Sequence, residues 1–248
     1  MVIDETADIA EAALNTRLSK TSDFGSGCSA DGNLIIEASV FDRMLAQLQA
    51  EGGFLASDEQ KAALRRVMWD DEGHRLPNTV AIAPQQLARA AGFTIPDDRK
   101  FIIVRGDGIG KQHPFSREKL TTLLAVYPYS GFDQALEMMR AVYEVGGKGH
   151  SCGIYSFDAD HIHRLAMAAP VSRIMVRQPQ SKANAGAFNN GMPMTSSLGC
   201  GTWGGNVVSE NVHLKHYLNT TWVSVPIQED RPSDAELFGD FYEPALEA

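Results

Sequence analysis

Residues 22–29 place Cys28 after two alternate glycines, Gly25 and Gly27, and ahead of an apolar run. Small residues let backbone N–H groups approach a reactant closely, because no β-carbon stands in the way. A thiolate at Cys28 could attack a carbonyl carbon, and these donors could hold the resulting oxyanion. The alternative is a turn that contains a free cysteine, since such residues usually behave as small buried hydrophobes. This stretch alone leaves both interpretations open.

Three arginine and lysine side chains lead into a long polar stretch. Residues 178–205 hold few apolar side chains, and a loop of this length in a compact domain is usually functional. Arg173, Arg177 and Lys182 could receive the anionic tail of a substrate, because arginine pairs well with a sulfonate or a carboxylate. A solvated basic surface is equally consistent with these positions. We therefore treat Arg177 and Lys182 as candidate substrate-binding residues.

Histidines and the remaining cysteines give weaker signals. His161 and His163 have no third ligand close by in the sequence, so we predict no metal site. Cys152 lies in an apolar run and is predicted to be a core residue. Cys200, between two glycines, is assigned to packing rather than to chemistry.

The elements that must position these residues alternate along the chain. Predicted strands end near residue 3 and cover residues 33–36, 80–82, 101–104, 123–127, 153–156 and 173–176. Predicted helices begin near residues 8, 39, 57, 84, 132 and 160, with Asp8 as an N-cap and a capping box at Ser57. This alternation predicts an α/β fold with a mostly parallel sheet covered on both faces.

Length and composition limit the class of protein. The 248 residues allow one large domain or two small ones. A net charge of −9 argues against nucleic acid as a partner. No apolar run approaches the roughly 20 residues that cross a bilayer, and the first residues lack a secretory leader pattern. Three widely spaced cysteines favour reduced thiols and a cytoplasmic location.

Four motifs, in this order, carry a resemblance to a known family. They are Ser19-Lys20-Thr21 with Asp23-Phe24-Gly25 and Cys28, residues 114–120, residues 146–150, and residues 198–206 with Ser209-Glu210-Asn211. Together they resemble the coenzyme-A-acylating branch of the aldehyde dehydrogenase superfamily, over roughly residues 3 to 225. Residues 219–221 and 236–239 look most similar to acylating sulfoacetaldehyde dehydrogenases.

The resemblance implies an architecture. Residues 1–216 would form the three-layer catalytic domain of an aldehyde dehydrogenase, with Cys28 on a loop at the edge of the sheet. Residues 217–248 would form an oligomerisation strand, at residues 220–225, and an acidic tail. The amino-terminal nucleotide-binding half of the family is absent from this sequence. We therefore expect a homo-oligomer, or a complex with such a half.

The resemblance also implies a reaction. Cys28 would attack a small aldehyde, NAD or NADP would accept the hydride, and coenzyme A would collect the acyl group from the cysteine thioester. Glu118 would bind the ribose of the nicotinamide nucleotide. His150 would act as a base towards the coenzyme A thiol. Sulfoacetaldehyde, which is anionic, is one candidate substrate.

Two departures leave alternatives open. Relatives commonly show Phe-Asp-Asn where this chain has Ser22-Asp23-Phe24, which changes the loop that leads to the nucleophile. Without a nucleotide-binding half, we expect little or no turnover by this chain alone. The chain could instead be a catalytically silent fragment or assembly subunit. It could also be a thioesterase or acyltransferase that uses Cys28 and His150.

Overall fold

The computed structural model describes residues 1–243 of the chain. It divides into two compact units, Met1–His216 and Tyr217–Ala248, of which residues 244–248 lie outside the described part. The assignment of these parts to catalysis and to oligomerisation stays a prediction. No helix among residues 1–243 has the length and apolar character that crossing a membrane requires.

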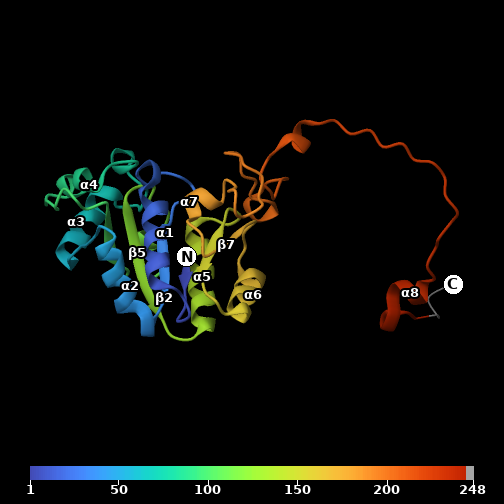
Figure 1. The fold of residues 1–248 in the computed structure, drawn as a ribbon, viewed down its shortest axis with the longest axis horizontal. Coiled ribbons are helices and arrows are strands. Elements are labelled where there is room, and N and C mark those ends of the chain that lie inside the picture. The colour runs from blue at the N-terminus through green and yellow to red at the C-terminus, as the bar shows by residue number, and fades with distance from the viewer. Residues whose placement is uncertain (244–248) are drawn as a thin grey trace. The chain divides into compact units, whose positions relative to one another are not determined.

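A parallel β-sheet forms the centre of the first unit (Figure 1). Its seven strands among the described residues lie in the order β3-β4-β5-β2-β1-β6-β7, and each pairing between neighbours is parallel. The strands are β1 Val2–Ile3, β2 Asn33–Glu37, β3 Gly53–Leu55, β4 Phe101–Arg105, β5 Leu123–Tyr129, β6 Cys152–Tyr155 and β7 Ile174–Val176. The α/β fold predicted from the sequence is confirmed, and the sheet is parallel throughout.

Helices cover both faces of this sheet, as the alternation of strand residues shows. In β4, Phe101 and Ile103 pack with α1 and α2, whereas Ile102 and Val104 pack with α3 and α4. Helices α5 and α6 cover the second face beside α3 and α4. The helices of the first unit are α1 Ile9–Thr21, α2 Ala38–Ala50, α3 Asp58–Met68, α4 Pro84–Ala90, α5 Phe132–Gly146, α6 Ala159–Ala168 and α7 Gln180–Ala183, and the second unit contains α8 Asp234–Phe238. The result is the predicted three-layer arrangement.

Parallel pairing places the amino ends of adjacent strands at the same end of the sheet. The loop of Cys28 leads into β2, which is the central strand of the sheet rather than an edge strand. His150 lies two residues before β6, and Glu118 lies shortly before β5. Because β5, β2, β1 and β6 are neighbours, these three residues gather at one end of the sheet. Open α/β sheets usually bind ligands at the opposite, carboxyl end.

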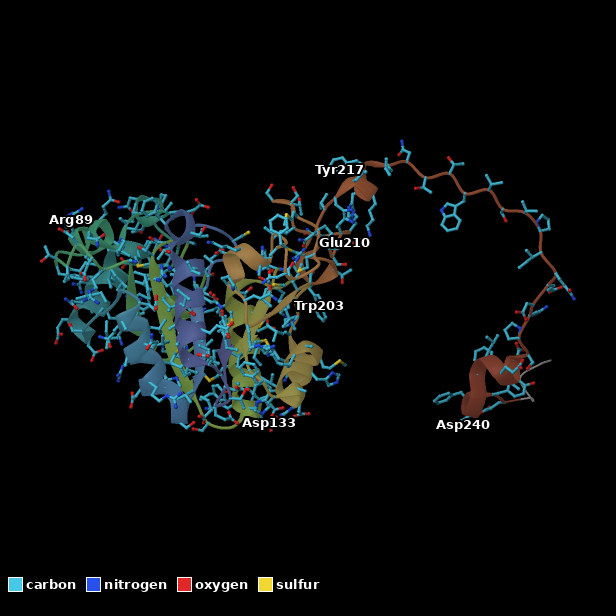
Figure 2. All side chains as sticks on the ribbon, in the orientation of Figure 1. Arg89, Asp133, Trp203, Glu210, Tyr217 and Asp240 are labelled. Atoms are coloured by element: carbon cyan, nitrogen blue, oxygen red, sulfur yellow. The ribbon has the colours of Figure 1, made fainter. Side chains whose placement is uncertain are left out.

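Two local predictions differ from the structure, and a third is not tested by a single chain. Residues 80–82 form no strand, because Ala81 adopts a left-handed conformation with φ of 54°. The short strand β3 was not predicted, since Gly53 reads as the end of a helix. Residues 220–225 form no strand in the single chain, and Trp222 is 91% exposed. Figure 2 shows the stretch that follows Tyr217 as an extended trace without a strand arrow. A strand needs a partner backbone, so the oligomerisation strand stays a prediction.

The loop that carries Cys28 packs at Gly25 against the backbone of Thr121 and of Lys20 in α1, which yields a test. Gly25 has φ of +71°, and a β-carbon there would lie 2.5 Å from the Thr121 carbonyl oxygen and 2.9 Å from that of Lys20. Gly25→Ala should therefore lower the free energy of unfolding by roughly 1–3 kcal/mol. Urea denaturation measures this change.

Gly27→Ala is the matched control, because a β-carbon at Gly27 meets nothing within 4 Å. This variant should stay within about 0.5 kcal/mol of the unmodified chain. Equal destabilisation by the two substitutions would show that Gly25 does not hold the loop by close approach.

Candidate active site

Cys28 is exposed on the loop between the 3-10 helix Ser22–Gly25 and β2. The hydroxyl of Ser19, which is buried in α1, accepts from the backbone N–H groups of Asp31 at 3.3 Å and Ser181 at 3.1 Å. Asp23 and Phe24, in the 3-10 helix before Cys28, both have positive φ. Consecutive non-glycine residues in this region are strained and occur mainly at functional sites. The loop is therefore both anchored and strained next to its cysteine.

The imidazole of His150 faces the sulfur of Cys28. Its Nε2 lies 3.1 Å from Sγ, and its Nδ1 lies 2.8 Å from the Ser151 hydroxyl. Burial lowers the pKa of His150, and the guanidinium of Arg173 lowers it further. A neutral imidazole is therefore favoured near neutral pH. Such a ring can accept the proton of the thiol when the sulfur attacks an electrophile.

Arg173 contacts the backbone of His150. Its guanidinium donates to the His150 carbonyl at 3.0 Å, the Gly199 carbonyl at 2.5 Å and Asn211 Oδ1 at 2.8 Å. Gly149, with φ of +106°, lies close to the loop of residues 198–211, and a β-carbon on Gly149 would lie 2.6 Å from the Cys200 carbonyl oxygen. The motif at residues 198–211 thus holds the backbone that positions His150.

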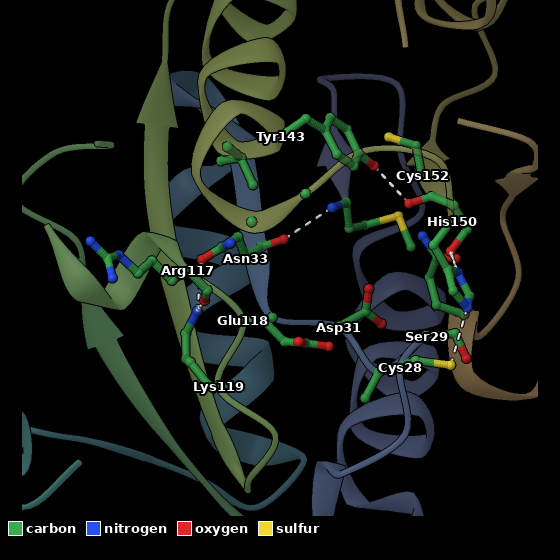
Figure 3. A pocket seen from close by; sticks show the side chains of 18 of the residues that line it. Cys28, Ser29, Asp31, Asn33, Arg117, Glu118, Lys119, Tyr143, His150 and Cys152 are labelled. Carbon is green, nitrogen blue, oxygen red and sulfur yellow. Dashed lines mark hydrogen bonds between the residues drawn. The ribbon is translucent and has the colours of Figure 1, made fainter. Parts of the chain in front are cut away.

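Glu118 lies across the cavity from this pair (Figure 3). Cys28, His150 and Glu118 line one cavity of about 270 Å³. Burial raises the pKa of Glu118, while the charges of Lys20 and Lys119 oppose that rise. A carboxylate at this wall could accept hydrogen bonds from two adjacent hydroxyls of a ligand. The structure therefore brings the three chemistry-bearing residues named from the sequence together.

Sequence reasoning assigned no role to several charged residues that line the same cavity, among them Lys20 and Asp31. Lys20 and Asp31 line it and are 1% and 4% exposed. Burial lowers the pKa of Lys20 to about 8, against the opposing charges of Asp31 and Glu118. Burial also raises the pKa of Asp31. The only indication in the sequence was their position: Lys20 follows Ser19 in the first motif, and Asp31 is the third residue after Cys28.

The predicted anion-binding residues do not reach this cavity. Arg177 follows β7, donates to the Ser156 carbonyl at 2.6 Å and stacks over Phe157 with its Cζ 4.3 Å from the ring centroid. It therefore lies at the carboxyl ends of the strands, whereas the cavity lies at their amino ends. Neither Arg177 nor Lys182 is among the residues that line the cavity. The guanidinium of Arg173 is occupied by His150, Gly199 and Asn211.

The remaining histidine and cysteines lie outside the cavity or in its wall. His161 Nδ1 lies 2.9 Å from Asp4 Oδ2, and with Glu5 these residues form a group whose ligand atoms lie within 4.8 Å of one another. The spacing of His161 and His163 could not predict this group, because Asp4 and Glu5 lie near the start of the sequence, far from both histidines. Cys152 is buried, as predicted, and Cys200 is partly buried.

Comparison with known proteins adds a family context. No protein-family model matches the chain. The chain is 38% identical over 244 residues to a sulfoacetaldehyde dehydrogenase of an Acholeplasma species, covering 97% of this chain and 50% of that protein. It is 35% identical over 245 residues to an acylating sulfoacetaldehyde dehydrogenase of Bilophila wadsworthia, covering 97% and 53%.

A solved structure agrees with these relatives. An acetylating aldehyde dehydrogenase from Geobacillus thermoglucosidasius superposes with a TM-score of 0.87 at 32% identity, over 94% of this chain and 51% of that one. The resemblance read from the four motifs is confirmed. The chain spans about half the length of the curated relatives it matches.

The buried amine of Lys20 predicts a pH dependence of stability. Its pKa of about 8 in the folded chain lies below the ordinary 10.5, so the unfolded chain binds more protons between these pH values. The free energy of unfolding should gain about 3 kcal/mol from Lys20 as pH rises through this window. Lys20→Met should lose that gain in urea denaturation at the two ends of the window.

Lys111→Met, at an exposed lysine, is the control and should keep the pH dependence of the unmodified chain. If Lys20→Met also keeps it, the Lys20 amine does not titrate as its burial implies.

Proposed function

Because the chain is a homologue of the acylating aldehyde dehydrogenases over about half of their length, we propose that it carries their acyl-transfer chemistry. Cys28 is the nucleophile, a small aldehyde is the substrate, and coenzyme A receives the acyl group. One observation carries the proposal. The sulfur of Cys28 lies 3.1 Å from a half-buried imidazole, at a cavity that also presents Glu118.

The residues of the site have separate roles in this reaction. The sulfur of Cys28 attacks the aldehyde carbon, and His150 accepts the thiol proton, so that a thiohemiacetal forms. A thioester on Cys28 would result when that carbon gives up a hydride to the nicotinamide acceptor and its hydroxyl group gives up a proton. The thiol of coenzyme A then attacks the thioester carbon, and the bond to the Cys28 sulfur breaks. Sulfur suits both halves, since it is a strong nucleophile as thiolate and a good leaving group.

The carboxylate of Glu118 fits a nicotinamide nucleotide. It lines the cavity wall, where it can accept from both hydroxyls of a ribose. A bound NAD or NADP supplies the hydride acceptor of the reaction. We propose that turnover also requires the half of the acylating aldehyde dehydrogenase relatives that the match to this chain does not cover. That portion can lie in the same polypeptide or in a separate nucleotide-binding partner, and further copies of this chain can assemble with it.

The cavity suits a small substrate. Its volume of about 270 Å³ lies near the lower end of ligand pockets. Four basic side chains, Lys20, Arg117, Lys119 and Lys148, line it beside the acidic Asp31 and Glu118, so the lining is compatible with an anionic tail. We propose sulfoacetaldehyde as the first substrate to test, because two relatives are named for it.

A second candidate is a thioesterase or acyltransferase that needs no nicotinamide. The contact between Cys28 and His150 favours it, because a thiol and a base suffice to open a thioester. Hydrolysis of an acyl thioester without nicotinamide, lost in Cys28→Ser, would distinguish this activity.

Complementation tests the leading proposal. The 248-residue chain is mixed with the unmatched half of the Bilophila wadsworthia relative, sulfoacetaldehyde, coenzyme A and NAD or NADP. We expect coenzyme-A-dependent appearance of the reduced nucleotide, with little from either part alone. Acetaldehyde and propionaldehyde serve as neutral comparison substrates.

Cys28→Ser should abolish this signal, whereas Cys200→Ser, at a cysteine outside the lining of the cavity, should retain it. Retained activity in Cys28→Ser would contradict the assignment of the nucleophile. A mixture that binds its partner without turnover would favour a silent assembly subunit.

A further inference from the structure

Asp31 is a buried carboxyl group in the cavity that the proposed reaction leaves without a task. It is the third residue after Cys28, it is 4% exposed, and it lines the same cavity. Its Oδ2 is shielded from solvent and has no hydrogen-bond partner within residues 1–243. Figure 3 shows this side chain pointing into the space between Glu118 and the pair formed by Cys28 and His150.

Such a group is costly to keep without a purpose. A buried polar atom that lacks a partner costs about 1–3 kcal/mol, and more when it is charged. Side chains of this kind concentrate at sites where a ligand completes the hydrogen bonds or where a proton moves. The position of Asp31, next to the nucleophile and inside the cavity, matches that situation.

Several charged groups face Asp31. Lys20 projects from α1, the amino group of Met1 lies at the start of β1, and Glu118 and Lys119 lie before β5. Burial raises the pKa of Asp31, while the ammonium groups of Met1 and Lys20 and the Ser19 hydroxyl oppose that rise. A carboxylate with a raised pKa is a stronger base, so it is better matched to a thiol proton.

The proposed reaction requires that two thiols lose their protons. The first belongs to Cys28, and His150 Nε2 is already in contact with that sulfur at 3.1 Å. The second belongs to the incoming coenzyme A. We propose that Asp31 accepts the proton of this incoming thiol during acyl transfer, an inference that rests on the proposed function. His150 then serves Cys28, rather than the coenzyme A thiol as the sequence suggested.

The transfer step balances without an oxidant. The S–H proton of the acceptor thiol moves to the carboxylate of Asp31, and the new S–C bond forms at the acyl carbon. The C–S bond to Cys28 breaks, and its sulfur leaves with the electron pair. The proton on Asp31 is then available to the leaving thiolate, directly or through His150.

The test isolates this step in the 248-residue chain. Cys28 is acetylated with p-nitrophenyl acetate, and the nitrophenolate burst measures that acylation. After the ester is removed, intact mass spectrometry follows loss of the acetyl group with and without coenzyme A. Asp31→Asn should slow the coenzyme-A-dependent loss about 100-fold and flatten its rise with pH. The burst and the slow loss to water should stay unchanged.

Two further variants keep the test decisive. Asp31→Glu retains a carboxylate and should recover much of the coenzyme-A-dependent rate, which a structural role would not explain. Asp23→Asn removes an exposed carboxylate on the same loop, outside the cavity lining, and should behave as the unmodified chain. Circular dichroism and thermal unfolding confirm that each variant is folded.

The outcomes separate the two proposals. A normal burst with an unchanged coenzyme-A-dependent rate and pH profile in Asp31→Asn would overturn the role of Asp31 alone. A burst slowed as much as the transfer would also overturn it, because the loop itself would then have changed. Absence of a burst in the unmodified chain would remove the nucleophile, and with it both proposals.

Discussion

The contact between Cys28 Sγ and His150 Nε2 joins residues that are 122 positions apart in the chain. It exists because each residue precedes a strand, and because β2 and β6 lie on either side of β1 in a parallel sheet. Parallel pairing places the amino ends of all these strands at one edge. Glu118, ahead of β5, reaches the same edge for the same reason. The parallel pairing of the strands therefore brings the residues of the site together.

Burial then sets the chemistry of the groups that the sheet assembles. The same desolvation lowers the pKa of His150 and Lys20 and raises that of Asp31 and Glu118. It disfavours charge on each group, so imidazole, amine and carboxyl groups move towards their neutral forms. A neutral imidazole and a more basic carboxyl group are what proton transfer from thiols needs. The same burial lowers stability, as is usual where function and folding compete.

Local features were predictable from the sequence, and long-range ones were not. The N-cap of Asp8 and the capping box of Ser57 depend only on neighbouring residues, and both are present. Cys28 and Glu118 could be named because four motifs, each modest alone, occur in the order found in the family. Arg177 was predicted to bind the substrate, but it does not line the cavity. It follows a strand whereas Cys28 precedes one, so in a parallel sheet the two residues lie at opposite ends of the strands. Asp31 was missed because burial of a carboxyl group is decided by elements distant in the sequence.

The central claim is that His150 activates Cys28, and site-resolved alkylation tests it most directly. Peptide mass spectrometry can follow the reaction of each cysteine with iodoacetamide at neutral pH, in the unmodified chain and in His150→Gln. The account predicts that Cys28 reacts at least about tenfold faster than the partly buried Cys200, and that His150→Gln removes most of this difference. Equal reactivity of Cys28 in the two proteins, at the rate of an ordinary thiol, would contradict it.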